Sequence, residues 1–266
     1  MHETLSEQLV AFVDHSLPVP GWADENPVRP SKQSETGYTD TKKGLSSEAP
    51  TDIEPVADVL HVGCGVYLRE KLPPVFRDAG WREIRLDIDP EVNPDIVASI
   101  IDMRAISDGT IDAVYSSHNV EHLYPHEVPL ALREMRRVLR AVGFALIKLP
   151  DLQEVARHVA EGRLEEQLYM SPMGPIAPLD ILYGHRPSLA GGNAFMAHRT
   201  GFTGETLGAA LVAAGFAAVL VQRDPPAFCL TAVAFSGAPS TEQVANAQAR
   251  MLPDPTRPAV LYTSSG

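Results

Sequence analysis

The sequence predicts an α/β fold, a doubly wound and mostly parallel seven-stranded sheet with helices on both faces. Short apolar runs alternate with helix-like segments between about residues 56 and 237. Such alternation is typical of parallel sheets, which bind ligands at the carboxyl ends of their strands. Only Pro225, Pro226 and a few neighbours separate the last two apolar runs. We therefore expect these two runs to form an antiparallel hairpin at the end of the sheet.

The expected strands are short runs rich in valine, isoleucine and leucine, the composition that is typical of buried strands. In chain order they cover residues 58–62, 83–88, 95–101, 111–117, 144–149, 217–221 and 228–235.

The expected helices lie between these strands. Apolar residues recur with helical spacing over residues 128–139, and Gly143 predicts the C-terminal stop of that helix. Residues 68–79 carry a weaker signal, because two adjacent prolines shorten or break a helix there. Residues 203–214 predict the last helix of the alternating pattern.

The two ends of the chain depart from this pattern. Residues 1–55 predict one N-terminal helix and a flexible arm, since a stretch rich in Pro, Ser, Thr and charge cannot bury enough apolar surface to offset its ordering entropy. Such an arm can order as a lid over a ligand. Residues 56–237 form the expected central domain, and residues 238–266 predict a C-terminal helix and tail.

Composition excludes several classes of function. The 266 residues contain 22 Lys and Arg against 34 Asp and Glu, a net charge of −12, which argues against nucleic acid as a partner. The sequence contains no apolar run long enough for a bilayer and no signal-peptide pattern, so we expect a cytoplasmic protein without a membrane partner. Cys64 and Cys229 are too few for a disulfide framework.

A nucleoside site is predicted at the ends of the first two strands. Gly63 and Gly65 directly follow the first strand, where small residues permit a tight turn. Asp87 ends the second strand, and a carboxylate there can accept hydrogen bonds from both ribose hydroxyls, each worth about 1.5–3 kcal/mol. Asp89 is an alternative ribose ligand, because its side chain lies on the same strand face.

These features belong to a longer series of motifs, namely Val59-Leu60-His61-Val62-Gly63-Cys64-Gly65, Leu86-Asp87-Ile88-Asp89, Asp102-Met103, residues 112–123, residues 136–140 and residues 201–216. Together they resemble the class I S-adenosylmethionine-dependent methyltransferases, and more narrowly the type 11 methyltransferase domain. The resemblance covers about residues 57–235 and implies a Rossmann-like methyltransferase fold with S-adenosylmethionine as cofactor.

The resemblance also implies which residues bind this cofactor. The two glycines would let the backbone approach its methionine part, Asp87 would bind the ribose, and Asp102 with Met103 would line the adenine. His61 stands where the family usually has an acid, and Tyr67 where it often has a third glycine. The expected cofactor residues are His61, Gly63, Cys64, Gly65, Asp87, Ile88, Asp102, Met103, Ser117 and His118.

Two other interpretations of the same motifs fit the sequence less well. A dinucleotide-binding G-x-G-x-x-G motif would need glycine where Leu68 stands. His118, Glu121 and His122 match H-x-x-E-H, an inverted zinc-protease signature. That signature requires one continuous helix and a third ligand, whereas Pro125 follows the run within three residues. The sequence therefore predicts no metal.

The acceptor is expected to bind the insert at residues 151–200, which is longer than usual connections and therefore typical of a lid or substrate segment. Residues 181–200 contain two arginines and two histidines but no acidic residue. We hypothesise an anionic acceptor, although the arginines could equally pair with carboxylates elsewhere. The expected catalytic residues are His185, His198 and Tyr183, and the expected substrate-binding residues are Arg186, Asn193 and Arg199.

The sequence thus predicts a methyltransferase acting on a small, anionic metabolite. Two alternatives remain open at this point. The same cofactor could undergo an internal cyclisation that releases methylthioadenosine, or the chain could be a non-catalytic cofactor-binding scaffold. A homodimer is also left open.

Overall fold

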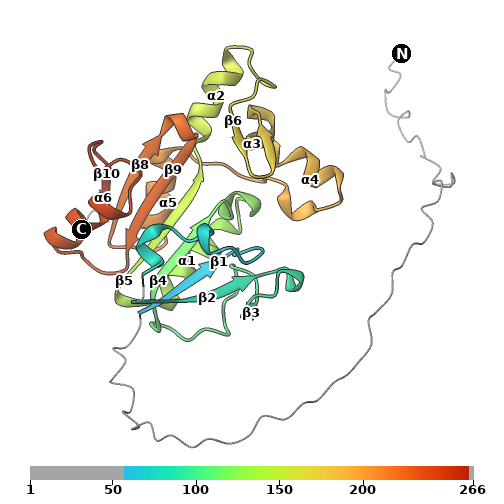
Figure 1. Ribbon diagram of the computed structural model, residues 1–266. Coiled ribbons are helices and arrows are strands. Elements are labelled where there is room, and N and C mark those ends of the chain that lie inside the picture. Colours follow the sequence, from blue (N-terminus) through green and yellow to red (C-terminus); the bar gives the residue numbers. More distant parts are fainter. Residues whose placement is uncertain (1–56, 79, 264–266) are drawn as a thin grey trace, which may run out of the picture. The chain divides into compact units, whose positions relative to one another are not determined.

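The computed structural model describes residues 57–78 and 80–263. The predicted N-terminal helix and arm lie outside these residues. The described part contains one large sheet with helices on both faces, which confirms the predicted α/β fold (Figure 1). Its strands are β1 (Ala57–Val62), β2 (Trp81–Asp87), β3 (Ile96–Val97), β4 (Ile111–Ser117), β5 (Leu139–Pro150), β8 (Ala218–Asp224), β9 (Cys229–Phe235) and β10 (Val260–Thr263).

The sheet order is β10-β8-β9-β5-β4-β1-β2-β3. The neighbours from β3 across to β5 pair in parallel, whereas β9 is antiparallel to both β5 and β8. The predicted closing hairpin is therefore present, with its turn at Pro225–Ala227. The order reverses beside β1, where ligands of parallel α/β sheets usually bind.

The sheet has one strand more than the seven predicted. β10 lies in the predicted C-terminal tail and pairs antiparallel with β8 at the edge of the sheet. Its Tyr262 ring packs on Gly208, where an added Cβ would come within 2.5 Å of a ring carbon. A single four-residue strand held by such long-range packing has no strong local signal, so sequence patterning missed it.

Helices cover both faces of the sheet. They are α1 (Val128–Val138), α2 (Leu152–Ala160), α3 (Pro178–Tyr183), α4 (Arg186–Ala190), α5 (Gly204–Ala213) and α6 (Thr241–Arg250). One core contains buried side chains of α1 and α5, and the other contains residues 72–76 and α6. In the part of the chain that the structure describes, no helix has the length and apolar character needed to cross a bilayer.

The predicted apolar face of α1 is buried, but its end differs from the prediction. The helix ends at Val138 and β5 begins at Leu139, four residues before Gly143. At Gly143 a Cβ would lie 2.8 Å from the carbonyl oxygen of Asp112 on β4. This glycine therefore permits close packing of two strands and does not cap the helix.

Residues 151–200 form a small structured unit beside the carboxyl end of the sheet (Figure 1, yellow to orange). It contains α2, the hairpin of β6 (Tyr169–Ser171) and β7 (Gly174–Ile176), α3 and α4. Val155, Ile176 and Ile181 pack with Phe228 into a separate apolar cluster. The insert therefore has its own secondary structure and packs through Phe228 against the rest of the domain.

Candidate functional site

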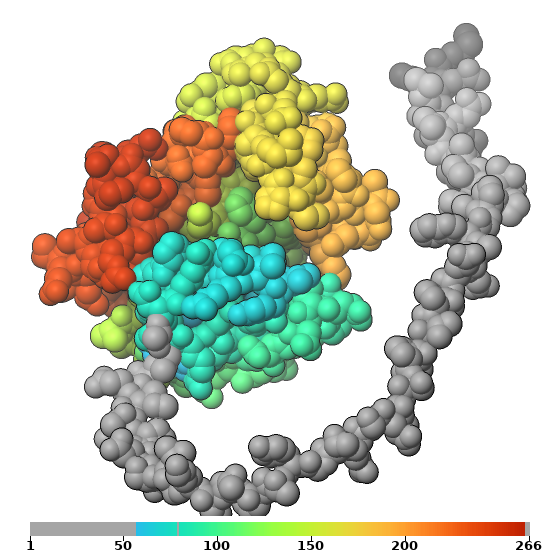
Figure 2. Space-filling model, in the orientation of Figure 1, coloured from blue at the N-terminus to red at the C-terminus, as the bar shows by residue number. Residues whose placement is uncertain are grey.

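A cavity of about 540 Å³ lies where β1, β2 and β4 end. This volume falls within the range of about 300–1,000 Å³ that is common for small-molecule and cofactor pockets. In Figure 2 the teal-to-green sheet residues and the orange part of the insert lie next to one another on one face of the molecule. The cavity is lined by residues from both: Gly63, Gly65, Asp87, Ile88, Asp89, Ala98, Ser99, Ile100, Ile101, His118, Asn119, His122, Leu123, Glu127, Asn193, Phe195, Met196 and Arg199.

The glycine turn after β1 brings bare backbone to the cavity. Gly63 and Gly65 have φ angles of +62° and +58°, in the left-handed region that glycine adopts most readily. A Cβ on Gly63 would come within 2.5 Å of the Asn119 side chain. The turn thus needs glycine for its conformation and for its close approach to Asn119, and it leaves space for a ligand.

Asp87 is the last residue of β2 and lines the cavity. Its Oδ2 accepts a hydrogen bond from the Gly65 nitrogen at 2.7 Å, and its Oδ1 accepts one from the Asp89 nitrogen at 3.0 Å. Each carboxylate oxygen can accept a second hydrogen bond. The carboxylate is therefore fixed in position and still able to bind a pair of ribose hydroxyls. Asp89 also borders the cavity.

Asp102 and Met103, the residues predicted to line the adenine, do not line this cavity. Met103 is fully buried in the main core, and Asp102 forms an ion pair with Arg104 beside a separate surface cavity. β3 ends at Val97 instead of the expected residue 101. Because the strand is shorter, the cavity wall is built from residues 98–101. Ile100 and Ile101 offer an apolar surface for a flat ring in place of the expected acid.

His61 and Cys64 do not line the cavity. The His61 side chain is buried, and its Nδ1 lies 2.7 Å from Glu83 Oε1. Burial lowers the pKa of this imidazole, although Glu83 partly offsets the effect. Cys64 is 2 % exposed, and burial raises the pKa of its thiol to about 11. Of this turn, the two glycines alone face the cavity.

His118 lines the cavity, whereas Ser117 does not. His118 has a φ of +50°, which is rare for a residue with a side chain and is found mostly at turns and functional sites. Burial opposes protonation, but interactions with Cys229 and Glu121 outweigh it and raise the pKa of His118 to about 10. An imidazole whose neighbours favour its protonated form therefore borders the cavity.

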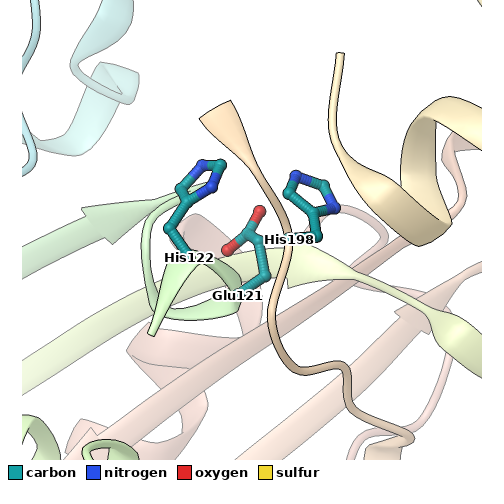
Figure 3. Close-up of side chains that lie close together, drawn as sticks. All are labelled: Glu121, His122 and His198. Carbon is teal, nitrogen blue, oxygen red and sulfur yellow. The ribbon is translucent and has the colours of Figure 1, made fainter. Parts of the chain in front are cut away.

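A second cavity, of about 260 Å³, adjoins the first at Arg199, which lines both. Its walls come from the end of β5, the first residues of α2, the end of α3 and residues 198–202, with Glu121 and His198 among them. Glu121 and His122 belong to a short 3₁₀ turn, Val120–His122, after β4. Figure 3 shows the Glu121 carboxylate between the imidazoles of His122 and His198.

The three predicted catalytic residues are separated by the structure. Tyr183 and His198 line the smaller cavity. His198 Nδ1 lies 2.6 Å from the Ile181 carbonyl oxygen, and burial lowers the pKa of this imidazole. His185 lies outside both cavities, and its Nδ1 bonds the Ser188 hydroxyl at 2.7 Å.

The three predicted substrate residues also differ in their surroundings. Asn193 lines the larger cavity, and its Oδ1 caps the turn at the Phe195 nitrogen. Arg186 is held by Asp180 and lies away from both cavities. Arg199 borders both, with its guanidinium carbon 4.7 Å from the centre of the Tyr124 ring and its Nη1 donating to the His122 carbonyl at 2.8 Å. Within residues 57–78 and 80–263 Arg199 forms no ion pair.

Several residues of the larger cavity were missed from the sequence. They are Ala98, Ser99, Ile100, Ile101, Asn119, His122, Leu123, Glu127, Phe195 and Met196. A signal existed only for Asn119 and His122, which follow β4 directly at the ligand-binding edge of a parallel sheet. The insert residues come from a segment remote in sequence, and only tertiary packing reveals them.

Comparison with known proteins gives one family match. Residues 60–147 match the model of a methyltransferase domain family. No curated protein matches the sequence significantly. Among solved structures, a methyltransferase from Archaeoglobus fulgidus that depends on S-adenosylmethionine is similar at 16 % identity, with 68 % of this chain and 86 % of that chain covered and a TM-score of 0.44.

Two further structures show comparable likeness. The 1,6-didemethyltoxoflavin-N1-methyltransferase from Burkholderia thailandensis, with bound 1,6-didemethyltoxoflavin and S-adenosylhomocysteine, has 17 % identity, coverage of 69 % and 72 %, and a TM-score of 0.43. A methyltransferase from Methanosarcina mazei that depends on S-adenosylmethionine has 13 % identity, coverage of 70 % and 95 %, and a TM-score of 0.45. At these values we draw nothing about the acceptor from them.

Proposed function

We propose that this chain is an S-adenosylmethionine-dependent methyltransferase, since residues 60–147 match the model of a methyltransferase domain family, and that its acceptor is a small anionic molecule bound beside Arg199. The bound cofactor supplies an electrophilic methyl group. Catalysis then depends on holding the acceptor close to that group, in line and shielded from water. The second cavity, next to the methionine end of the larger one, has the place and size for such an acceptor.

The residues of the larger cavity fit the cofactor in three parts. We assign the ribose to Asp87, with Asp89 as the alternative, and the adenine to the apolar wall at Ile100 and Ile101. The methionine part fits against Gly63 and Gly65, whose φ angles and lack of side chains keep this end of the cavity open. Asp102 and Met103 are not included in this assignment.

The observation that carries the anionic acceptor is the position of Arg199. It lines both cavities, and among the described residues it has no carboxylate partner. Its backbone nitrogen donates to the Glu121 carbonyl at 2.8 Å, and its Nη1 donates to the His122 carbonyl. These bonds fix the side chain while leaving guanidinium donors available for a carboxylate or phosphate, which arginine binds in a fork geometry.

A methyl-transfer assay tests this proposal. The full chain is incubated with methyl-labelled S-adenosylmethionine and with a panel of small carboxylates and phosphates, each paired with its neutral ester or amide. We expect label transfer and S-adenosylhomocysteine with the anionic member of a pair. Release of methylthioadenosine instead would favour the cyclisation alternative, and cofactor binding without any turnover would favour the scaffold.

Variants of Arg199 then test whether this side chain binds the anionic group of the acceptor. Arg199→Met is expected to raise the KM of the anionic acceptor by about 10- to 150-fold, the equivalent of one lost charge-assisted hydrogen bond. Arg199→Lys should recover part of this loss because it keeps the charge. An unchanged KM in Arg199→Met, or equal turnover of neutral and anionic partners, would contradict the proposal.

A further inference from the structure

We propose that Glu121, His122 and His198 form a binding site for a divalent transition-metal ion of the zinc type, in the wall between the two cavities. One donor atom from each of the three side chains lies within 4.8 Å of the other two. Two imidazoles and one carboxylate are a common ligand set of catalytic zinc, which keeps a further position open for water or substrate. Figure 3 shows the three side chains converging from the turn after β4 and from the insert.

The hydrogen bonds of the two histidines leave the correct ring nitrogens available. His122 Nδ1 lies 3.1 Å from the Ala197 carbonyl oxygen, and His198 Nδ1 lies 2.6 Å from the Ile181 carbonyl oxygen. A carbonyl only accepts, so each Nδ1 carries the proton and each Nε2 has a free lone pair. Metal-bound histidines almost always donate their second nitrogen in this way, which fixes the ring for coordination.

Glu121 provides a second and independent observation. Its side chain is 2 % exposed, yet neither of its carboxylate oxygens accepts a hydrogen bond within the part of the chain that the structure describes. The nearest charged partner is His118 Nδ1, 3.3 Å from Oε1. A buried carboxylate normally accepts several hydrogen bonds or binds a metal, because its desolvation is costly, and the single contact with His118 leaves most of its acceptor capacity unused. A cation between Glu121 and the two imidazoles satisfies it.

The backbone holds the two halves of the site together. Arg199 and Thr200 donate their backbone nitrogens to the Glu121 carbonyl at 2.8 and 3.2 Å, next to His198. Metal bonds of about 2.0–2.2 Å imply donor separations of about 3.4 Å, so the side chains must turn slightly inward on binding. The ion can enter from solvent, since His122 lines the larger cavity while Glu121 and His198 line the smaller.

The proposed ligands do not follow the H-x-x-E-H pattern as one helical unit. Its first histidine, His118, is not among them, and Glu121 and His122 lie in a short 3₁₀ turn. The third ligand is His198, which lies in the insert and is remote from His122 in the sequence. His198 then acts as a ligand instead of the predicted base. A bound ion at this wall would lower the pKa of a hydroxyl coordinated from either cavity.

Calorimetric titration of the metal-free full chain with Zn²⁺, without cofactor or acceptor, tests the proposal. We expect one Zn²⁺ per chain in the wild type, and affinity at least about tenfold weaker in Glu121→Gln and in His198→Ala, since removing even a supporting group of a metal site costs about 10- to 100-fold. His126→Ala is the control, because this exposed histidine belongs to the same region but not to the site. Mg²⁺ should not compete, since it prefers oxygen ligands.

Two readouts keep the test decisive. Zn²⁺ should raise the melting temperature of the wild type and of His126→Ala but not of Glu121→Gln, which is nearly isosteric and removes a buried charge. Co²⁺ should give d–d absorption without a thiolate charge-transfer band. No Zn²⁺ binding by the wild type, equal affinity in Glu121→Gln, or a thiolate band from a cysteine would overturn the assignment. Because methyl transfer is not measured, failure of the proposed acceptor would not affect this result.

Discussion

Arg186 and Asp180 form a two-pronged ion pair that fastens the start of α4 to α3. Nε of Arg186 lies 2.8 Å from Oδ1 of Asp180, and Nη2 lies 3.1 Å from Oδ2. The Asp180 carboxylate also accepts hydrogen bonds from the backbone nitrogens of Ala177 and Arg186. One of the two arginines predicted to bind the acceptor is therefore engaged within the fold, and Arg199 is left as the cation beside both cavities.

We predict that Arg186→Met changes stability and not acceptor recognition. Loss of the guanidinium leaves the buried Asp180 carboxylate without its charged partner, which commonly costs about 3–5 kcal/mol for a buried pair. Because the Arg186 side chain is half exposed, solvent screens the pair and the loss should be smaller than for a fully buried pair. Urea unfolding measures the loss, and the KM of the anionic acceptor should stay within about twofold of the wild type. A large KM effect here, equal to that of Arg199→Met, would return Arg186 to the site.

The same ion pair predicts an acid dependence of stability. Burial opposes ionisation of Asp180, but hydrogen bonds from Arg186 and from the backbone outweigh it and lower the pKa of the carboxyl group to about 2. A folded-state pKa below the unfolded value of about 3.9 means that the stabilisation, about 2 kcal/mol, is present above pH 4 and is lost as the pH falls through 2.

The matched variant for this pH dependence is Asp180→Asn, which cannot ionise. Its free energy of unfolding should lie about 2 kcal/mol or more below that of the wild type near neutral pH. The gap should narrow between about pH 4 and pH 2. A gap of constant size over this interval would show that the ionised carboxylate of Asp180 does not stabilise the fold.

Gly184 is predicted to be essential for the position of His198 and Arg199. It has a φ of +101°, and an added Cβ would lie 1.9 Å from the Met196 carbonyl oxygen. Gly184→Ala should therefore destabilise the protein by at least about 2 kcal/mol, since it adds both backbone strain and a backbone clash.

Gly162→Ala is the matched control for this glycine. Gly162 also has a positive φ, +78°, but a Cβ there would meet nothing within 4 Å. Denaturant unfolding of both variants separates the cost of the conformation from the cost of the clash. Gly184→Ala should be the less stable by at least about 1 kcal/mol; equal losses would mean that the close approach of Met196 has no consequence.

Asp151 combines two roles at the end of β5. Its Oδ1 caps the first turn of α2 at the nitrogens of Gln153 and Glu154, and its Oδ2 lies 2.6 Å from Nε of Arg223. The residue is 0 % exposed. Asp151→Ala should cost about 3–5 kcal/mol, because it removes the cap and breaks a buried ion pair.

Ser240 offers a comparison for Asp151, because it caps α6 without an ion pair. Ser240→Ala should cost about 1 kcal/mol. Thermal or urea unfolding of the two variants measures the difference. If Asp151→Ala cost no more than Ser240→Ala, the buried pair with Arg223 would add nothing to stability.

Much of the fold could be read from the sequence, because its strands are short apolar runs with clear ends. β4 was predicted with its observed bounds, Ile111–Ser117, and α1 with its buried face. The missed elements carry weaker local signals. α2 is capped by Asp151, as is typical of a helix start, but prolines and glycines are frequent in the rest of the insert and weaken its helical pattern.

The sequence predicts which residues line the cavity where a residue directly ends a strand, and fails where the strand end is misjudged. Gly63, Gly65 and Asp87 line the cavity as expected. Asp102 and Met103 do not, since β3 ends at Val97 and the next residues, 98–101, form the cavity wall, after which Asp102 lies on the surface and Met103 in the core. The meeting of His198 with Glu121 could not be predicted, because it depends on how the insert folds back over the sheet.

The affinity of two aspartate variants for S-adenosylmethionine tests the proposed placement of the cofactor most directly. S-adenosylmethionine is titrated by calorimetry into the wild type, Asp87→Asn and Asp102→Asn. Asp87→Asn should bind at least about tenfold more weakly, since it removes the charge from hydrogen bonds worth about 1.5–3 kcal/mol each. Asp102→Asn should bind like the wild type, because Asp102 lies outside the larger cavity. Unchanged affinity in Asp87→Asn, or a loss in Asp102→Asn alone, would contradict the proposed placement of the cofactor.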